Sequence, residues 1–430
     1  MNPILRLLSI PSFVLFVMGA LISTTANSAE QLYSEQPTVM PELAVFGDLA
    51  VGVRTEQISN PSQLSAKDFK TLADRDLTVE IWYPATKNET SVLVTYRDVT
   101  RSKQAFELQG QAFRDAELLK SEQKFPLVVI SHGYTDYRAL MFYLAEHLTS
   151  HGYVVISIDH TDSTNAEVDF DKAPSSGFPS TLLNRARDQQ FVLDHFSRQD
   201  DALAGAIDFD NATIIGYSMG GYGAINTVGG CYSFSSTGLE LFGFPAELAA
   251  ALAPVFSSCK AAREDVDARW KAMVAFAPWG GELNVHDLDS LADIEVPSFY
   301  IAGDQDDISG YEDGVKKLFT HTGSDNKYML VYENARHNIA KHPAPKVAFN
   351  NDLDIGHYFE PAWNSETINR VNEHMVLAFL NCHIKQQDRY CDFLPTREDI
   401  TQTKSPDGKL TEAWPGFKER WGTGIKFYRQ

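Results

Sequence analysis

The stretch that most constrains the fold is residues 212–225, in which an apolar run leads through Gly-Tyr-Ser-Met-Gly at residues 216–220 into a second apolar run. The first run predicts a short buried strand, and the second predicts the start of a helix. A sharp turn between them would hold the hydroxyl of Ser218 exposed at the end of a sheet. Glycine is expected on both sides of the serine because a side chain there would collide where strand and helix approach. The segment therefore predicts a nucleophilic serine rather than an ordinary glycine turn.

Apolar runs that alternate with helical patterns extend from this turn in both directions. Their continuous apolar character is typical of strands buried on both faces of a parallel sheet. The predicted strands are residues 125–130, 153–159, 212–215, 272–277, 298–302 and 328–332, and the predicted helices are residues 137–151, 182–196 and 367–384. This order predicts a doubly wound, mostly parallel α/β sheet with ligands at the carboxyl ends of its strands.

The segment before the first parallel strand is less regular. Residues 76–84 alternate between apolar and polar side chains, which predicts a half-buried antiparallel strand, and residues 50–54 predict an edge strand. Residues 86–124 are polar, and within them we expect a helix at about residues 104–119.

The N-terminus, residues 1–29, has the pattern of a cleaved signal peptide. Arg6 is followed by an apolar stretch and then by small residues at 26–29. A retained membrane anchor is the alternative, but Pro11 and nearby serines leave the stretch short of the roughly 20 apolar residues that a span needs. We therefore expect a secreted or periplasmic protein without a stable membrane anchor, with a catalytic domain at residues 30–395. Residues 396–430 are expected to form a tail whose aromatic side chains pack back onto that domain.

Charge and cysteine content narrow the function further. A formal net charge of −20 argues against nucleic acid as a partner and favours neutral or cationic substrates.

Four cysteines in an exported chain suggest two disulfides. Of the three possible pairings, Cys231–Cys259 with Cys382–Cys391 is favoured because each pair brackets one compact segment. Neither spacing resembles a zinc site. Hydrolysis by a serine nucleophile implies no metal and no organic cofactor, so none is expected. The oligomeric state stays open.

An insertion interrupts the alternation of strands and helices between the helix predicted after Ser218 and the next strand. Residues 229–270 are rich in Phe, Leu and Ala and carry Cys231 and Cys259. A segment at this place would overhang the serine, so we expect an inserted helical lid. A surface excursion unrelated to the site is the alternative.

A serine nucleophile needs an imidazole base, and the imidazole needs a carboxylate that fixes its tautomer. In this fold class the acid follows the serine, and the histidine follows the acid. The acid is expected after the strand at 298–302, where spacing alone does not choose among three carboxylates, Asp304, Asp306 and Asp307. The base is expected after the strand at 328–332, which favours His337 over His342 and His357.

The oxyanion of the reaction needs two backbone N–H donors. One is expected from Met219, the residue after the nucleophile, and the other from the loop after the strand at 125–130. In that loop Gly133 lets the backbone turn, so that the N–H of Tyr134 would point into the site. His132 is expected to be a structural hydrogen-bonding residue and not a second base.

Four motifs together resemble the dienelactone-hydrolase-like α/β-hydrolases. They are Ser-His-Gly-Tyr at residues 131–134, Ser-His-Gly-Tyr-Val-Val at 150–155, Ile-Asp-His at 158–160 and Gly-Tyr-Ser-Met-Gly-Gly at 216–221. Within that family the chain is similar to bacterial relatives of the type II platelet-activating-factor acetylhydrolases, over about residues 77–393. The resemblance implies an α/β-hydrolase fold and serine-dependent ester hydrolysis.

Three features also resemble the bacterial cutinases and polyester hydrolases: Gly-Tyr-Thr at 133–135, Ala-Pro-Trp at 277–279, and Met219. In that group the corresponding tyrosine and tryptophan flank the scissile ester, which implies substrate contacts for Tyr134 and Trp279. The Gly-x-x-Asp of the family matches residues 303–306 and selects Asp306. The acetylhydrolases carry their acid after the preceding strand, where this chain has Ala-Pro-Trp and no carboxylate. This departure favours the cutinase-like placement over a phospholipid substrate.

The sequence thus predicts an exported serine hydrolase that cleaves a small or lipid-like carboxylic ester through Ser218, His337 and Asp306. A polyester or cutin hydrolase and an acetylhydrolase are alternatives on the same triad, although the expected lid argues against a polymer. An amidase and a non-catalytic binding protein on a hydrolase scaffold are more distant alternatives.

Overall fold

The computed structural model describes residues 29–34, 40–88, 90–242, 244–259, 266–395, 399–401, 406–409, 414–417 and 422–430. The expected signal peptide, residues 1–29, lies outside the described residues except for Ala29. Among the helices of the described part, none is both long enough and apolar enough to cross a membrane.

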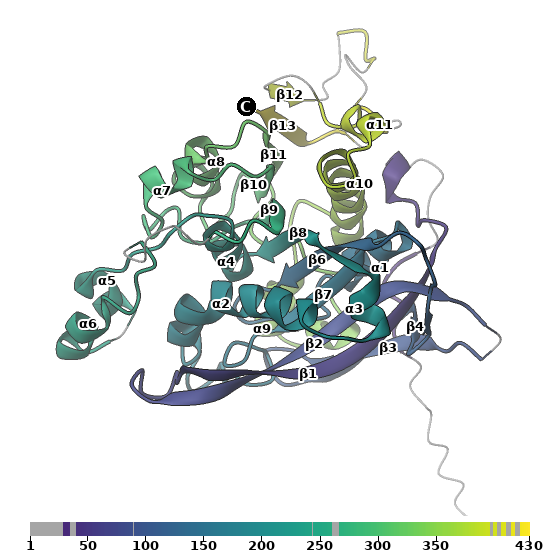
Figure 1. The fold of residues 1–430 in the computed structure, drawn as a ribbon. Coiled ribbons are helices and arrows are strands. Elements are labelled where there is room, and N and C mark those ends of the chain that lie inside the picture. The colour runs from purple at the N-terminus through teal and green to yellow at the C-terminus, as the bar shows by residue number, and fades with distance from the viewer. Residues whose placement is uncertain are drawn as a thin grey trace, which may run out of the picture.

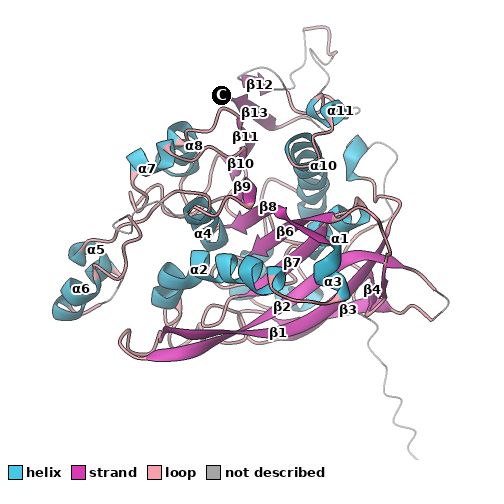
Figure 2. Cartoon of the chain, in the orientation of Figure 1, coloured by secondary structure: helices cyan, strands magenta, loops and turns pink. Residues whose placement is uncertain are grey.

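A mixed sheet runs through the molecule in the order β12-β13-β11-β10-β9-β8-β6-β7-β2-β1-β4-β3, and its central strands are parallel (Figure 2). The parallel strands are β6 (Phe125–Ser131), β7 (Val154–Asp159), β8 (Ile207–Tyr217), β9 (Trp270–Phe276), β10 (Ser298–Gly303) and β11 (Lys327–Tyr332). Each corresponds to one of the apolar runs predicted as a strand, and β8 also extends over the mostly polar residues 208–211 before its run. The sequence-based prediction of a doubly wound, mostly parallel sheet is confirmed.

Helices cover the two faces of this sheet and enclose two separate cores (Figure 1). Along β6, Val128 and Ile130 face the core beneath α1 (Phe142–Ser150) and α10 (Ser365–His383), while Leu127 and Val129 face the other core. That second core lies beneath three helices, α2 (Phe178–Ser197), α4 (Met219–Thr227) and α8 (Lys316–His321). The shorter helices are α3 (Ala202–Ala206), α7 (Leu288–Ala292), α9 (Asp352–Tyr358), α11 (Asp388–Cys391), the 3₁₀ turns Glu42–Ala44 and Lys346–Asn350, and a π-helical turn Tyr311–Val315.

Strands that pair antiparallel, apart from a short parallel contact between β1 and β4, extend the sheet on its N-terminal side and correct two expectations. They are β1 (Ala50–Leu64), β2 (Leu72–Thr86), β3 (Leu93–Val99), β4 (Ala105–Arg114) and the short β5 (Glu117–Leu118). The helix expected at residues 104–119 is wrong, because Phe106, Leu108 and Ala112 are buried in alternation with exposed neighbours, which is the period of a strand. The edge strand expected at residues 50–54 is also wrong, since β1 lies between β2 and β4 and the edge is β3.

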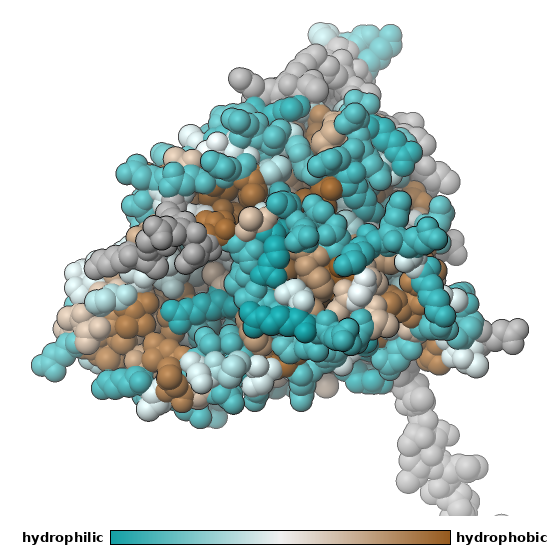
Figure 3. Space-filling model, in the orientation of Figure 1, coloured by the Kyte–Doolittle hydropathy of each residue, from teal (hydrophilic) through white to brown (hydrophobic). Residues whose placement is uncertain are grey.

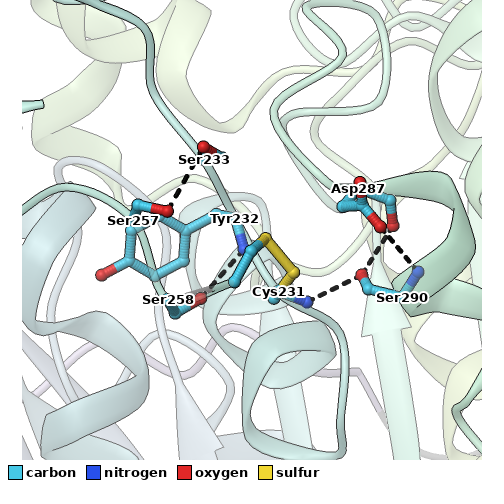
Figure 4. Close-up of a disulfide and its surroundings, with 8 residues drawn as sticks. Cys231, Tyr232, Ser233, Ser257, Ser258, Asp287 and Ser290 are labelled. Carbon is cyan, nitrogen blue, oxygen red and sulfur yellow. Dashed lines mark hydrogen bonds between the residues drawn. A yellow bond between two sulfur atoms is a disulfide. The ribbon is translucent and has the colours of Figure 1, made fainter. Parts of the chain in front are cut away.

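The insertion after α4 forms two short helices, α5 (Ser236–Leu241) and α6 (Ala246–Leu252), at the left of Figure 1. Apolar side chains gather over this part of the surface in Figure 3, and Leu241 is 83% exposed. A disulfide joins Cys231 to Cys259 at the base of the insertion, and Figure 4 shows its surroundings. There Ser290 Oγ accepts a hydrogen bond from the Cys231 N–H at 3.0 Å, which ties the base to α7.

The second disulfide, Cys382–Cys391, joins α10 to α11, so both bridges have the pairing predicted from the sequence. Beyond it, β13 (Ile425–Arg429) pairs antiparallel with β11, and β12 (Asp399–Thr401) pairs with β13. Three aromatic side chains of the tail, Trp414, Phe417 and Phe427, are buried against the core beneath α10. The described parts of the tail therefore continue the sheet of the domain.

Candidate active site

Ser218 sits at a sharp turn between β8 and α4, in a backbone conformation that a serine rarely adopts, with φ 53° and ψ −113°. The glycines of the motif make this turn possible. A Cβ at Gly220 would lie 1.9 Å from the carbonyl oxygen of Ser131, and one at Gly216 would lie 2.2 Å from the carbonyl oxygen of Gly220. The turn is the strained strand-to-helix junction that the sequence predicted, and it holds the hydroxyl at the carboxyl edge of the sheet.

His337 and Asp306 complete a hydrogen-bonded chain that begins at Ser218. The Nε2 atom of His337 lies 3.0 Å from Ser218 Oγ, and its Nδ1 lies 3.0 and 2.9 Å from the two carboxylate oxygens of Asp306. Since a carboxylate can only accept, Nδ1–H donates to Asp306, and Nε2 is left to accept the serine proton. His337 comes from the loop after β11, and Asp306 from the loop after β10.

The surroundings of Asp306 favour its ionised form. Burial by itself would raise the pKa of this carboxyl, but the charge and hydrogen bond of His337 act in the opposite direction. The N–H groups of Ile308 and Ser309 also donate to Asp306 Oδ1, at 2.9 and 2.8 Å. Together these interactions hold the pKa of Asp306 below its usual range. Asp306 is thus a fixed anion facing the imidazole.

The rival residues have other partners. Asp304 accepts a hydrogen bond from the N–H of Asn334 at 2.6 Å, and Asp307 pairs with Arg336. His342 is fully buried between Tyr137 and the carbonyl of Pro343, and His357 lies 2.6 Å from Asp136. The structure joins Asp306 to His337, and His337 to Ser218. The rival residues, Asp304, Asp307, His342 and His357, are not part of this hydrogen-bonded chain.

The loop expected to supply an oxyanion donor lies directly against the serine, since a Cβ at Gly133 would be 3.2 Å from Ser218 Cβ. The carbonyl of Gly133 accepts hydrogen bonds from His132 Nδ1 at 2.7 Å and Arg185 Nη2 at 3.3 Å. Since N–H and C=O point in opposite directions across a trans peptide, these bonds fix the direction of the Tyr134 N–H. Within the described part of the chain, neither that N–H nor the N–H of Met219 has an acceptor.

His132 acts here as a structural residue, as expected. Its Nε2 accepts a hydrogen bond from the N–H of His160 at 3.1 Å, which leaves Nδ1–H to donate to Gly133. Burial and the nearby charge of Arg185 lower the pKa of His132 to about 3. The imidazole is therefore neutral at physiological pH and keeps one tautomer.

The two aromatic residues expected to contact substrate differ in position. Tyr134 lines the cavity at Ser218, and its hydroxyl donates to the carbonyl of Pro174 at 2.7 Å. Trp279 is 9% exposed and packs against Phe178 and Phe242, the latter from the insertion, with ring centroids 5.5 and 6.0 Å apart. The backbone N–H of Trp279 donates to the carbonyl of Ser218 at 3.1 Å, but Trp279 does not line this cavity.

The cavity at Ser218 has a volume of about 290 Å³ and is more polar than the sequence indicated. Its wall comes from the end of β8, from the loops after β3, β6, β10 and β11, and from α9 with the segment that follows it. The lining residues are Arg101, Tyr134, Asp136, Tyr217, Ser218, Asp307, Ile308, Arg336, His337, Asn338, Lys341, Gly356, His357, Phe359 and Pro361. None of the described residues of the insertion at 229–270 lines it, so coverage of a bound acyl group by that insertion stays a prediction.

Comparisons with known proteins find similarity to carboxylic ester hydrolases. A family model described as PETase, PET hydrolase-like, matches residues 118–231. Cutinase 2 of Thermobifida cellulosilytica is 34% identical over 107 residues, which cover 25% of this chain and 35% of the cutinase. Cutinase est2 of Thermobifida alba is 23% identical over 276 residues, covering 64% of this chain and 65% of that protein. The platelet-activating factor acetylhydrolase of Cavia porcellus is 30% identical over 146 residues, covering 26% and 33%.

A solved structure adds a likeness over more of the chain. The ferulic acid esterase from Streptomyces cinnamoneus superposes with a TM-score of 0.54 over 84% of this chain and 94% of the esterase. At 15% sequence identity this likeness concerns the fold alone. For the cutinases, the matching region spans only 29% to 35% of the length of the first three relatives.

Proposed function

We propose that this chain, which belongs to the α/β-hydrolases and is related to the cutinases, hydrolyses carboxylic esters with Ser218 as its nucleophile. The observation that carries the proposal is the hydrogen-bonded chain from Ser218 Oγ through His337 to an ionised Asp306. A nucleophile, a base and an orienting acid within hydrogen-bond distance form the arrangement that activates a serine hydroxyl.

The first half of the proposed reaction forms an acyl-enzyme. Ser218 Oγ attacks the ester carbonyl carbon while its proton passes to His337 Nε2, and Asp306 stabilises the imidazolium that forms. The N–H groups of Tyr134 and Met219 bind the negative carbonyl oxygen. The carbon–oxygen bond to the leaving group then breaks, and His337 returns the proton to the departing oxygen. An alcohol leaves, and the acyl group stays on Ser218.

The second half releases the acid. Water gives a proton to His337 Nε2 and attacks the acyl carbonyl, and the same two N–H groups bind the oxyanion. The bond between the acyl carbon and Ser218 Oγ breaks, and the proton returns from His337 to the serine. The products are a carboxylic acid and the free enzyme, so no group beyond water is consumed.

The size of the cavity supports a small or short-chain acyl or alcohol group as the substrate part next to Ser218. A volume of about 290 Å³ is near the lower end of the range of ligand pockets, roughly 300–1,000 Å³. Polyester hydrolysis is the second candidate, and the cavity mouth favours it. Ile308 and Phe359 line the cavity and are 55% and 54% exposed, so they could contact an apolar polymer chain.

Export is part of the proposal. Two disulfides support an oxidising compartment, in agreement with the signal peptide expected at residues 1–29. We infer that the protein acts outside the cytoplasm.

The proposal is tested with a fluorophosphonate probe and a series of 4-nitrophenyl esters of increasing chain length, with a polyester film alongside. Ser218→Ala should abolish both labelling and hydrolysis without unfolding the protein. His337→Ala should cost nearly as much activity, because triad members act as a unit. The matched control is His342→Gln, which should retain activity. Hydrolysis by Ser218→Ala, or loss of activity only in the His342 variant, would contradict the proposal.

A further inference from the structure

Arg101 brings a positive charge to the wall of the Ser218 cavity. It lies in the turn between β3 and β4, and α9 holds that turn in place. The Thr100 hydroxyl donates to Asp354 Oδ2 at 2.8 Å, and the N–H of Ser102 donates to Asp354 Oδ1 at 2.9 Å. Asp354 belongs to α9, which lines the same cavity through Gly356 and His357. The position of Arg101 is thus fixed by groups on both sides of it.

The guanidinium of Arg101 has few partners. Its Nη2 donates to the carbonyl of Tyr134 at 3.3 Å, and its central carbon lies 4.7 Å from the centre of the Phe170 ring. Its Nε is buried and has no hydrogen-bond partner. Arg101 makes no ion pair with any residue of the described part of the chain. Arg101 as a whole is half-buried, but a buried N–H donor of a cation that has no acceptor is costly unless an anion reaches it.

The other charges of the cavity compensate one another. Arg336 pairs with Asp307, and Asp136 Oδ1 lies 3.3 Å from Lys341 Nζ and 2.6 Å from His357 Nε2. Among the described cavity-lining residues, Arg101 is the permanent cation that lacks a carboxylate partner. Burial lowers the pKa of Arg101, with Asp136 opposing the shift. An arriving anion would relieve this penalty.

We propose that the ester cleaved at Ser218 carries a carboxylate, which binds Arg101 during the reaction. This inference rests on the proposed ester hydrolysis and adds the substrate class. The planar guanidinium can offer two parallel N–H donors to a carboxylate. An anionic substrate differs from the neutral or cationic one expected from the net charge of −20, because a cation lines the cavity itself. A half-ester of a short dicarboxylic acid is of a size that suits about 290 Å³.

The carboxylate can belong to the acyl part or to the leaving group, and two substrate pairs distinguish these sources. The first pair is 4-nitrophenyl hydrogen succinate and neutral 4-nitrophenyl pentanoate. The second pair is 4-acetoxybenzoate and neutral 4-acetoxybenzamide. For each pair the measured quantity is the ratio of kcat/KM for the anionic ester to kcat/KM for its neutral partner.

Arg101→Gln should lower this ratio about ten- to hundredfold for the pair whose anion reaches the guanidinium, the effect of losing one charge-assisted hydrogen-bonded pair. Arg101→Lys, which keeps the charge without the fork, should recover part of the ratio. The matched control is Arg97→Gln, since Arg97 lies on β3 with its side chain 70% exposed and pairs with Glu107. That variant should leave both ratios at the wild-type value.

A ratio that Arg101→Gln leaves unchanged for both pairs overturns the inference. If that variant fails to fold, the wild-type protein decides: benzoate should inhibit at least about tenfold more strongly than benzamide, and equal inhibition overturns the inference. Neutral esters that are cleaved without any charge preference remove the carboxylate proposal alone. Absence of both ester cleavage and fluorophosphonate labelling removes the proposed function, and this inference with it.

Discussion

Asp306 fixes the position of one proton, which lies on Nδ1 of His337. Asp306→Asn keeps the shape of the side chain, but the amide can stabilise the wrong tautomer of His337. We expect kcat to fall about 10⁴-fold, as in other triads with this change. Steady-state kinetics on a short-chain 4-nitrophenyl ester gives the measurement. Asp304→Asn is the control, because Asp304 bonds the N–H of Asn334 and does not contact His337. A larger loss in the Asp304 variant would mean that the acid lies two residues earlier.

The residues of the hydrogen-bonded chain were predictable because their order along the chain follows the order of the strands. Ser218 and His337 follow from that order, whereas choosing Asp306 among three neighbouring carboxylates needed the family resemblance. Arg101 could not be predicted. It is one cation in a polar segment, and only the tertiary contact between its turn and Asp354 on α9 brings it to the cavity.

At the scale of elements, the parallel strands could be read from the sequence and the antiparallel ribbon could not. β6 and β9 are apolar except for Ser131 and Lys271, because helices cover both faces of these strands. In β4, polar residues such as Glu107 and Gln111 alternate with apolar ones, and the surrounding polar composition hid this period. The insertion was predictable as an apolar excursion, but its contact with Trp279 through Phe242 depends on tertiary packing.

The Cys231–Cys259 bridge allows a test of the insertion. It closes a loop of 28 residues at the base of α5 and α6. The loop-entropy estimate gives such a bridge about 3–4 kcal/mol of stability. The double change Cys231→Ala with Cys259→Ala should lower the free energy of unfolding by about that amount. It should also alter the preference for acyl chain length, because Phe242 packs on Trp279, while Ser218 is still labelled.

The other disulfide provides the comparison. Cys382–Cys391 closes a loop of 9 residues between α10 and α11, away from the Ser218 cavity. Removing it should reduce stability by about 2–3 kcal/mol and leave the chain-length preference as it was. Urea unfolding and the 4-nitrophenyl ester series measure the two effects. Identical chain-length profiles for both double variants would show that the insertion does not influence the acyl site.

At the scale of the whole molecule, many ionisable groups are buried. Their shifted pKa values determine how the free energy of unfolding depends on pH. Ten of the twelve histidines have a lowered pKa, chiefly because burial disfavours their charged form. Between roughly pH 4 and 6.5 such a histidine binds a proton in the unfolded chain but not in the native protein. Stability therefore rises with pH in this window. Among the described residues, five carboxyls with a raised pKa oppose this trend in part: Asp98, Glu146, Asp159, Glu360 and Glu373.

A change at His342 would measure the contribution of a single histidine to this pH dependence. This histidine is fully buried beside Tyr137, and burial lowers its pKa to about 4, with the charge of Lys341 adding to the shift. His342→Gln replaces it with a side chain that can still donate and accept hydrogen bonds but does not titrate. We expect the slope of unfolding free energy against pH to fall by one proton, about 1.4 kcal/mol per pH unit, between about pH 4.5 and 6. Urea unfolding of wild type and variant at half-unit intervals measures both slopes. Parallel curves through this window would mean that His342 is protonated in the native protein.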